Sequence, residues 1–406
     1  MTADEAVALA VRQNPRLSAA ARDIVAARRG VSSARALANP SVTFTPGITG
    51  SAGSDEELLV TQPLELNGTR SARAGVASAQ LRRTQAEATV ELRNLVQQTK
   101  NAYYELARFQ ELQALAQDVL RTAEEFHRGV RRQAEEGLRP QIDPVQTEIE
   151  LNRARQQVTL ADSQVSTAQA TLNTLLGRAP AEPVRAQPLM TEASSAPVPD
   201  TAPPIDRDTV LGQALAGRAE ITAETAQREA FVQEARLARA QGRPDLAPQF
   251  RAGSITRGVQ QTGVGLGITL PFLDYGSRRN RIRQAEASAS AQEARVEATR
   301  NQVRQEVSQA VTRLEAAAAV VQQYRQGVLD QARRLLDASL RALQLGAPGA
   351  SILTVLEAQR TYRGVVTEYT TALANHAQAR AELERAAGSV PATLLPGASP
   401  DLRTSK

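Results

Sequence analysis

The sequence predicts a mainly α-helical protein with a small β part, built as two similar halves of one chain. Three observations support this class. Ala, Gln, Arg and Glu dominate a chain of 406 residues that is only 3% aromatic, which is typical of long helices. Heptad spacing of apolar and small residues continues over two very long stretches, as in coiled coils. Four short extended runs occupy matching positions in segments 1–179 and 207–388.

The first half, 1–179, begins with short helices and then enters a β-hairpin over about 41–66. A long helical hairpin follows over about 69–177, with a tip at EEGLRPQID (135–143), where Gly and Pro break the helix. A seven-residue repeat in its first arm predicts supercoiled packing against neighbouring helices. The repeat consists of Leu81, Ala88, Leu95, Ala102, Phe109 and Ala116.

The second half, 207–388, repeats this order with a β-hairpin over about 248–272 and a long helical hairpin over about 277–388. The turns before the two long helices match, since Pro63 and Gly68 correspond to Pro271 and Gly276. Its heptad series consists of Val307, Leu314, Val321, Val328 and Leu335. The Pro-rich segment 180–206 is predicted to be a surface linker between the halves, and 389–406 is a similar tail.

One extended run, TGVGLGITLPF from Thr262, alternates large apolar side chains with glycines. This alternation fits a barrel strand with one face toward lipid and the other toward a lumen. We expect four strands of about 9–11 residues, the length of a tilted strand that crosses a bilayer. Four strands are too few to close a membrane barrel, so two chains would give eight strands and three would give twelve. The alternative is two surface hairpins that cap a soluble helical bundle, and the pattern leaves both open.

Composition argues against several function classes. The chain has no Cys, and its two histidines, His127 and His376, lie on separate predicted helices without a metal-ligand pattern. We therefore predict no catalytic, cofactor or metal site. No apolar run of about 18 residues predicts a transmembrane helix, and no signal peptide precedes the first helix. The net charge is +5, but the arginines alternate with Glu and Gln, which favours solvated helix faces over a nucleic-acid-binding block.

Taken together, residues 3–388 resemble the TolC family of outer-membrane efflux ducts. The resemblance lies in the duplicated order of parts, the two tips, and four segments: ADEAVALAVRQNPRL, TQPLELNGTRSAR (61–73), LPFLDYGSRR (270–279) and ILTVLEAQRTYRGV (352–365). The PLELNGTR form is most similar to the cation-efflux (CzcC- or CusC-like) branch. The resemblance implies a homotrimer with a shared 12-stranded transmembrane β-barrel, four strands from each chain, and a trimeric α-helical barrel in the periplasm. It implies a periplasmic adaptor, an inner-membrane pump and outer-membrane lipid as partners, and no nucleic acid. It also implies that the chain does no bond-making chemistry and is not an enzyme.

The resemblance also assigns roles to residues. Glu357 matches an entrance acid that would form a ring of three carboxylates in a trimer, whereas Thr354 stands where some relatives carry Asp. Asp143 matches an acid of a gate-locking network, although its apparent partners here, Leu343 and Pro348, cannot hydrogen-bond through their side chains. A local interpretation instead makes Asp143 a helix N-cap before Pro144.

Two further groups complete the expected sites. The tips would dock the adaptor through Gly137, Leu138, Arg139, Pro140, Gly346, Ala347, Pro348 and Gly349. Lipid would contact Val264, Leu266, Ile268 and Leu270, and the intervening glycines would keep the lumen wide. The expected function is a duct that passively exports small molecules or metal cations. The alternatives are a type I secretion duct of the same fold, a soluble coiled-coil scaffold, and a nucleic-acid-binding helical protein.

Overall fold

The computed structural model describes residues 1–46, 56–138, 140–189, 205–253, 261–271, 274–345 and 351–388. These form two compact units. The helical unit comprises Met1–Ser18, Glu91–Gly217 and Val303–Lys406, and the strand-bearing unit comprises Ala19–Val90 and Arg218–Gln302. Two long helices, α3 (Thr69–Glu135) and α8 (Ser277–Gln323), contribute residues to both units. The prediction of a mainly helical chain with a small β part is confirmed, and the four strands form one sheet.

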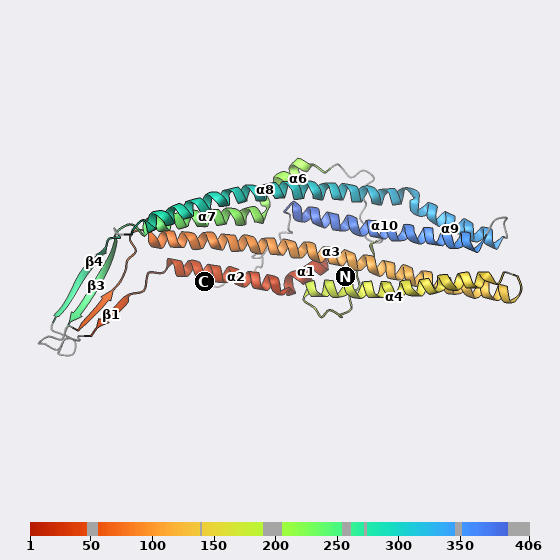
Figure 1. Cartoon of the computed structure of the whole chain (residues 1–406), viewed down its shortest axis with the longest axis horizontal. Coiled ribbons are helices and arrows are strands. Elements are labelled where there is room, and N and C mark those ends of the chain that lie inside the picture. Colours follow the sequence, from red (N-terminus) through yellow and green to blue (C-terminus); the bar gives the residue numbers. More distant parts are fainter. Residues whose placement is uncertain are drawn as a thin grey trace. The chain divides into compact units, whose positions relative to one another are not determined.

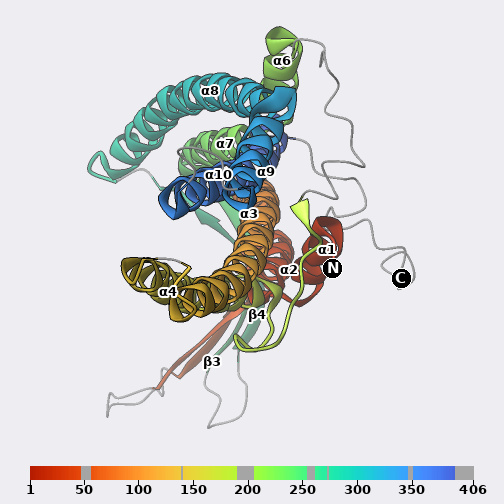
Figure 2. The ribbon, with the colours of Figure 1, turned by 90° about the vertical axis from the view of Figure 1, so that its right-hand side faces the viewer.

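The helical unit contains α1 (Ala3–Gln13), α4 (Ile142–Leu176), α6 (Arg207–Gly217), α9 (Leu329–Gln344) and α10 (Ile352–Ala386), together with parts of α3 and α8. Helix α1 starts with a capping box, in which Thr2 and Glu5 each accept a backbone N–H of the other. In Figure 2 the paired arms α3–α4 and α9–α10 are seen almost end-on. The core that joins α1 to α3 and α4 mixes small and large residues, including Ala6, Tyr103 and Leu172. The small residues allow α1 to pack closely against α3 and α4.

The heptad prediction holds along α3. Its six positions from Leu81 to Ala116 are all buried or half-buried. The predicted linker, 180–206, is described only at its two ends. At the first end, Tyr103 accepts a hydrogen bond from the Gln187 N–H at 3.0 Å and donates one to the Met1 carbonyl at 2.8 Å. These bonds hold the start of the linker against the helical unit. The rest of the linker, 190–204, and the tail, 389–406, lie outside the described residues.

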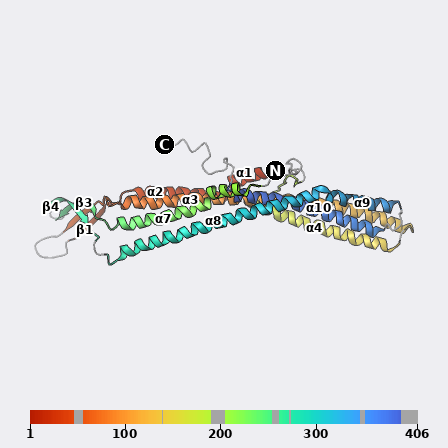
Figure 3. The same ribbon diagram turned by 90° about the horizontal axis from the view of Figure 1, so that it is seen from above.

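The second heptad series is interrupted by a π-helix, η2 (Tyr324–Val328), where Gly327 adopts a φ of +134°. Figure 1 shows the kink where α8 passes into α9, and Figure 3 shows α9 lying beside α10. Buried and half-buried residues follow heptad spacing up to this point, and the same spacing resumes one residue late. The positions before are Val303, Val307, Ala310, Leu314, Ala317, Val321 and Tyr324, and those after are Leu329, Ala332, Leu336, Ser339 and Leu343.

This shift corrects part of the predicted seam. Val328 and Leu335 were expected to continue the series from Val321, but they are 39% and 49% exposed. A π-helical turn holds more residues than an α-helical turn, so it rotates everything after it around the helix axis. The seam therefore continues through the next residue in each case, Leu329 and Leu336.

The strand-bearing unit holds most of α2 (Pro15–Arg35), α7 (Ala219–Ala240) and the sheet. The strands are β1 (Ser41–Thr45), β2 (Glu57–Thr61), β3 (Asp245–Gly253) and β4 (Gln261–Thr269), antiparallel in the order β1-β2-β3-β4. Figure 1 shows them beyond the ends of the helices of this unit. Strands β1 and β2 are five residues long, shorter than expected. Pro46 follows β1 directly and has no N–H to extend the ladder. No helix in the described ranges is long and apolar enough to cross a membrane.

Candidate functional site

Strand register places apolar side chains together on one face of the sheet. Residues directly opposite each other in antiparallel strands share a face. One row crosses all four strands and joins Val42, Val60, Phe250 and Val264. Every second residue along a strand lies on the same face, so this face also carries Phe44, Leu58, Ala252, Leu246, Ile268, Pro248 and Leu266. The apolar alternation recognised in β4 therefore continues across β3, β2 and β1.

The opposite face is mostly polar or bare, with Leu59 and Ala247 as its apolar members. One of its rows joins Thr43, Leu59, Arg251 and Gly263, and the next contains Ser41, Thr61, Gln249 and Gly265. Arg251 also forms an ion pair with Glu57 at 2.7 Å, on the same face. A sheet with one apolar face and one face made mainly of hydroxyls, charges and glycines can separate an apolar medium from an aqueous one.

The apolar face is exposed. Val264 is 89% exposed, and Val42, Phe44, Leu266 and Ile268 are each more than half exposed. Of the four residues predicted to contact lipid, Val264, Leu266 and Ile268 lie on this face, and Leu270 is exposed immediately after β4. A contiguous apolar surface of this kind marks a membrane or partner contact.

The glycines of β4 differ in what surrounds them. A Cβ placed on Gly263 or Gly265 would meet no atom within 4 Å, whereas one on Gly267 would lie 2.6 Å from Gln249 Nε2. Of these three glycines, only Gly267 has close neighbours, which are the end of the flexible Gln249 side chain and the Ala247 carbonyl at 3.3 Å. Among the described strands, β1 and β4 each pair on one side, so the sheet has two open edges.

The tip of the α3–α4 hairpin is built as a helix stop. Gly137 has a φ of +73°, and the N–H groups of Gly137 and Leu138 donate to the carbonyls of Ala134 and Gln133 at 3.1 and 2.8 Å. This is the Schellman pattern that satisfies the last carbonyls of a helix. Leu138 and Pro140 are exposed, as a docking surface requires. Arg139 and the whole second tip, Gly346, Ala347, Pro348 and Gly349, lie outside the described residues.

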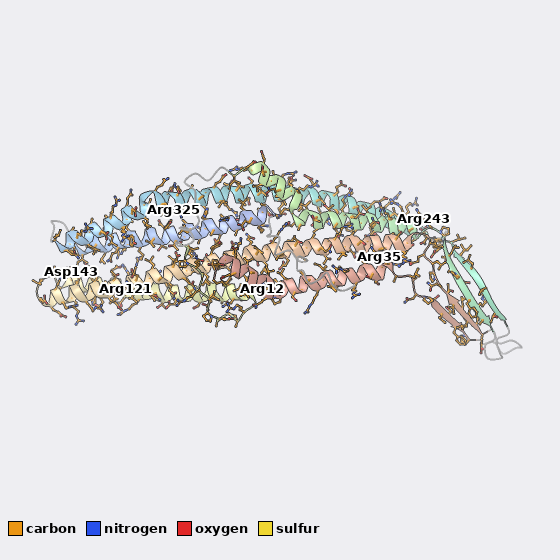
Figure 4. The ribbon with its side chains drawn as sticks, turned by 180° about the vertical axis from the view of Figure 1, so that it is seen from behind. Arg12, Arg35, Arg121, Asp143, Arg243 and Arg325 are labelled. Atoms are coloured by element: carbon orange, nitrogen blue, oxygen red, sulfur yellow. The ribbon has the colours of Figure 1, made fainter. Side chains whose placement is uncertain are left out.

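The two predicted entrance acids lie on different hairpins. Glu357 is exposed on α10, and Asp143 lies in the first turn of α4, near the end of the hairpin (Figure 4). The N-cap interpretation of Asp143 is wrong, because α4 begins at Ile142 and Gln141 occupies the cap. Asp143 still lies at the positive end of the helix dipole. Leu343, which stands where a lock partner was expected, packs instead in an apolar cluster that includes Val130 and Ile352.

An ion pair that sequence reasoning missed joins α4 to α10. Glu150 accepts hydrogen bonds from Arg153 on its own helix at 2.7 Å and from Arg360 on α10. The Glu150 side chain is only 16% exposed. Glu150 and Arg360 line a cavity of about 120 Å³ among α3, α4, α9 and α10, with apolar neighbours such as Phe126 and Leu356. No local pattern reveals a partner 210 residues away.

The two histidines are held by helix packing. His127 Nδ1 lies 2.9 Å from the Thr147 hydroxyl. Burial lowers the pKa of His376, and the positive charges of Arg380 and Arg325 lower it further. Figure 4 labels Arg325, which belongs to the π-helix. Within the described ranges, no group of three or more His, Asp or Glu side chains could hold a metal ion.

Long antiparallel helical hairpins joined to a sheet with one exposed apolar face define a class of channel-forming outer-membrane proteins. The chain belongs to the outer membrane efflux protein family, whose sequence profile matches residues 6–178 and 210–389.

Its relatives agree with this assignment. The chain is 26% identical to the cobalt-zinc-cadmium resistance protein CzcC of Cupriavidus metallidurans, over 96% of this chain and 90% of that protein. Among solved structures, the outer-membrane channel OprN has a TM-score of 0.78 at 19% identity and covers 97% of this chain and 91% of its own. CusC has a TM-score of 0.78 at 16% identity and covers 96% of this chain and 92% of its own. The last two similarities establish the fold alone.

Proposed function

We propose that the chain is the outer-membrane duct of a tripartite efflux system, through which cargo passes passively from the periplasm to the outside. The observation that carries this proposal is the sheet, which combines a largely exposed apolar face with two open edges among the described strands. An unpaired backbone group in lipid costs several kcal/mol. The edges must therefore pair with strands of other chains, and three copies would close a twelve-stranded barrel.

The same assembly accounts for the helices. We propose that segments 1–179 and 207–388 are two copies of one structural repeat, and the two stretches matched by the family profile support this division. Their helical hairpins would line a periplasmic α-barrel in the trimer. The tips at 137–140 and 346–349 would meet a periplasmic adaptor bound to an inner-membrane pump.

For the cargo, we propose divalent metal cations or small molecules, with cations favoured by the similarity to CzcC. Glu357 would supply one carboxylate per chain to a ring at the entrance, which attracts cations. Thr354 lies one turn before Glu357 on α10 and carries no charge, so the ring would have a single layer. Asp143 would add negative charge near the same end of the channel.

The first test is the native mass in mild detergent. The trimer predicts a mass about three times the 43.5 kDa of one chain, stable only while detergent is present. A monodisperse monomer or dimer that stays in solution without detergent would refute the shared barrel.

Single-channel conductance then tests the two faces of β4. Gly265→Val adds a side chain whose Cβ would meet no atom within 4 Å in its own chain, so the trimer should assemble normally. Conductance should nevertheless fall if this face lines the lumen. Thr262→Val, on the opposite face of the same strand, is the matched control and should conduct like the wild type. Equal conductance in all three proteins would contradict the assignment of the faces.

Glu357→Gln tests the entrance ring. Removal of three like charges from a constriction should reduce the preference for cations over anions. Glu125→Gln is the control, because it removes the same charge from an exposed acid on a different helix, α3. If the preference for cations over anions changed equally in both variants, Glu357 would not lie at the entrance.

A further inference from the structure

Arginines gather where the helices of the strand-bearing unit meet its sheet. They are Arg35 at the end of α2, Arg70 and Arg73 in the first turns of α3, Arg243 between α7 and β3, and Arg278, Arg279, Arg281 and Arg283 in the first turns of α8. Figure 4 labels Arg35 and Arg243, both near the ends of helices that face the strands. The same short segments contain three carboxylates, those of Glu65, Asp245 and Asp274. The junction is therefore strongly positive.

The three carboxylates are already engaged. Glu65 accepts two hydrogen bonds from Arg73, at 2.6 and 3.0 Å. Asp245 accepts the Leu66 N–H at 3.0 Å. Asp274 accepts two backbone N–H groups, which lower its pKa, and lies 3.8 Å from the Arg278 guanidinium. Glu65 and Asp274 therefore pair with Arg73 and Arg278, and in the described part of the chain no ion pair joins Asp245 to a junction arginine.

Six arginines remain exposed, and the described residues supply no carboxylate partner for them. They are Arg35, Arg70, Arg243, Arg279, Arg281 and Arg283. Arg279 and Arg283 are four residues apart on α8, so their side chains share a helix face. The positive ends of the α3 and α8 dipoles lie in the same region and also favour an anion.

Exposed apolar and aromatic side chains lie beside these arginines, next to the sheet. Tyr275 is 96% exposed in the turn before α8, and Leu66 and Leu270 are more than half exposed. The order from the sheet outward is therefore apolar strands, then Tyr and Leu, then Arg. Amphipathic rings and long basic side chains concentrate where hydrocarbon gives way to headgroups.

We propose that these six junction arginines form a belt that binds the phosphate groups of anionic phospholipids at the membrane surface. The inference rests on the proposed function, because the sheet must lie in the membrane for the belt to reach the headgroups. Charge complementarity selects an anion, and the guanidinium fork matches phosphate geometry. Continuity with the apolar face of the sheet selects a lipid over a nucleic acid or an acidic protein.

The test uses the full-length chain, purified in mild detergent and titrated with phosphatidylglycerol or phosphatidylcholine, with bound lipid counted by native mass spectrometry. The wild type should bind phosphatidylglycerol in preference to phosphatidylcholine. The combined variant Arg243→Gln, Arg279→Gln and Arg283→Gln should lose this preference by about tenfold or more, since each basic residue near an anionic surface contributes severalfold. The control Arg128→Gln, Arg333→Gln and Arg341→Gln makes the same charge change in the helical unit, at exposed positions, and should keep the preference.

Planar-bilayer insertion separates the two possible failures. A wild type that inserts and conducts but shows no preference for phosphatidylglycerol would overturn the belt and leave the duct intact. Equal loss in the junction variant and the control would also overturn it, because net charge alone would then explain the binding. A wild type that never inserts into a bilayer would refute the proposed function itself.

Discussion

Deleting Gly327 should preserve the packing of α9 and α10, although removing one residue from a long helix normally shifts everything that follows. The π-helix places the heptad series one residue late, at Leu329 and Leu336 rather than Val328 and Leu335. Without Gly327, Leu329 and Leu336 fall on the positions that an uninterrupted heptad from Val321 requires. The deletion also removes a backbone conformation that strongly favours glycine.

Gly327→Ala makes the opposite change, because it keeps the extra residue and adds a Cβ at a φ of +134°. Space is not the obstacle, since the nearest atom to that Cβ would be Gln331 Nε2 at 3.8 Å. The cost is therefore backbone strain of about 1–3 kcal/mol. In a local opening equilibrium, this corresponds to about 5- to 150-fold faster amide hydrogen exchange.

Hydrogen exchange of the α9 amides, Leu329–Gln344, separates these variants. Exchange should be as slow as in the wild type after deletion of Gly327 and faster by the stated factor in Gly327→Ala. Deletion of Arg334 is the matched control, because it moves Leu336 and Leu343 off the buried face. If the Gly327 deletion exchanged as fast as the Arg334 deletion, the π-helix would not be a one-residue insertion in the heptad, and our reasoning would be wrong.

Three further perturbations test local interactions. Burial lowers the pKa of His376, so the folded state disfavours the protonated imidazole. The stability that this preference contributes is present above pH 6.5 and should be lost as the pH falls below that value. The thermal unfolding temperature of His376→Gln should lack this part of the pH dependence. A double-mutant cycle with Glu150→Gln and Arg360→Gln should give a coupling of about 1 kcal/mol, and a coupling near zero would show that the pair does not hold α4 to α10. Arg73→Lys should cost about 1–2 kcal/mol in the strand-bearing unit, because lysine cannot keep the two-pronged contact with Glu65 and also donate to the Ala34 and Ala36 carbonyls at the end of α2. Unchanged hydrogen exchange at the end of α2 would contradict this role.

The helices, the positions of the four strands and the turns that precede α3 and α8 could be predicted because each depends on local chemistry. Gly68 and Gly276, matched in the sequence, adopt φ values of +89° and +85° before α3 and α8, where glycine avoids the steric cost. The alternation in β4 fixes which of its residues share a face. In β2, by contrast, Leu58, Leu59 and Val60 are consecutive and apolar, so the sequence allows either face. Pairing with β1 and β3 decides that Leu58 and Val60 join the apolar face.

The candidate sites divide in the same way. The sequence places Glu357 on a helix and Gly137 in a turn, since these depend on neighbours in the chain. The contact between Glu150 and Arg360 depends on how two hairpins pack, and no periodicity encodes it. The heptad phase beyond Gly327 was also undetermined by the sequence. Val328 and Leu329 are both apolar, as are Leu335 and Leu336, so either phase presents a suitable seam. Only packing in the folded helical unit selects the later residue of each doublet, because a single extra residue rotates the helix and a close-packed core accepts one of the two faces.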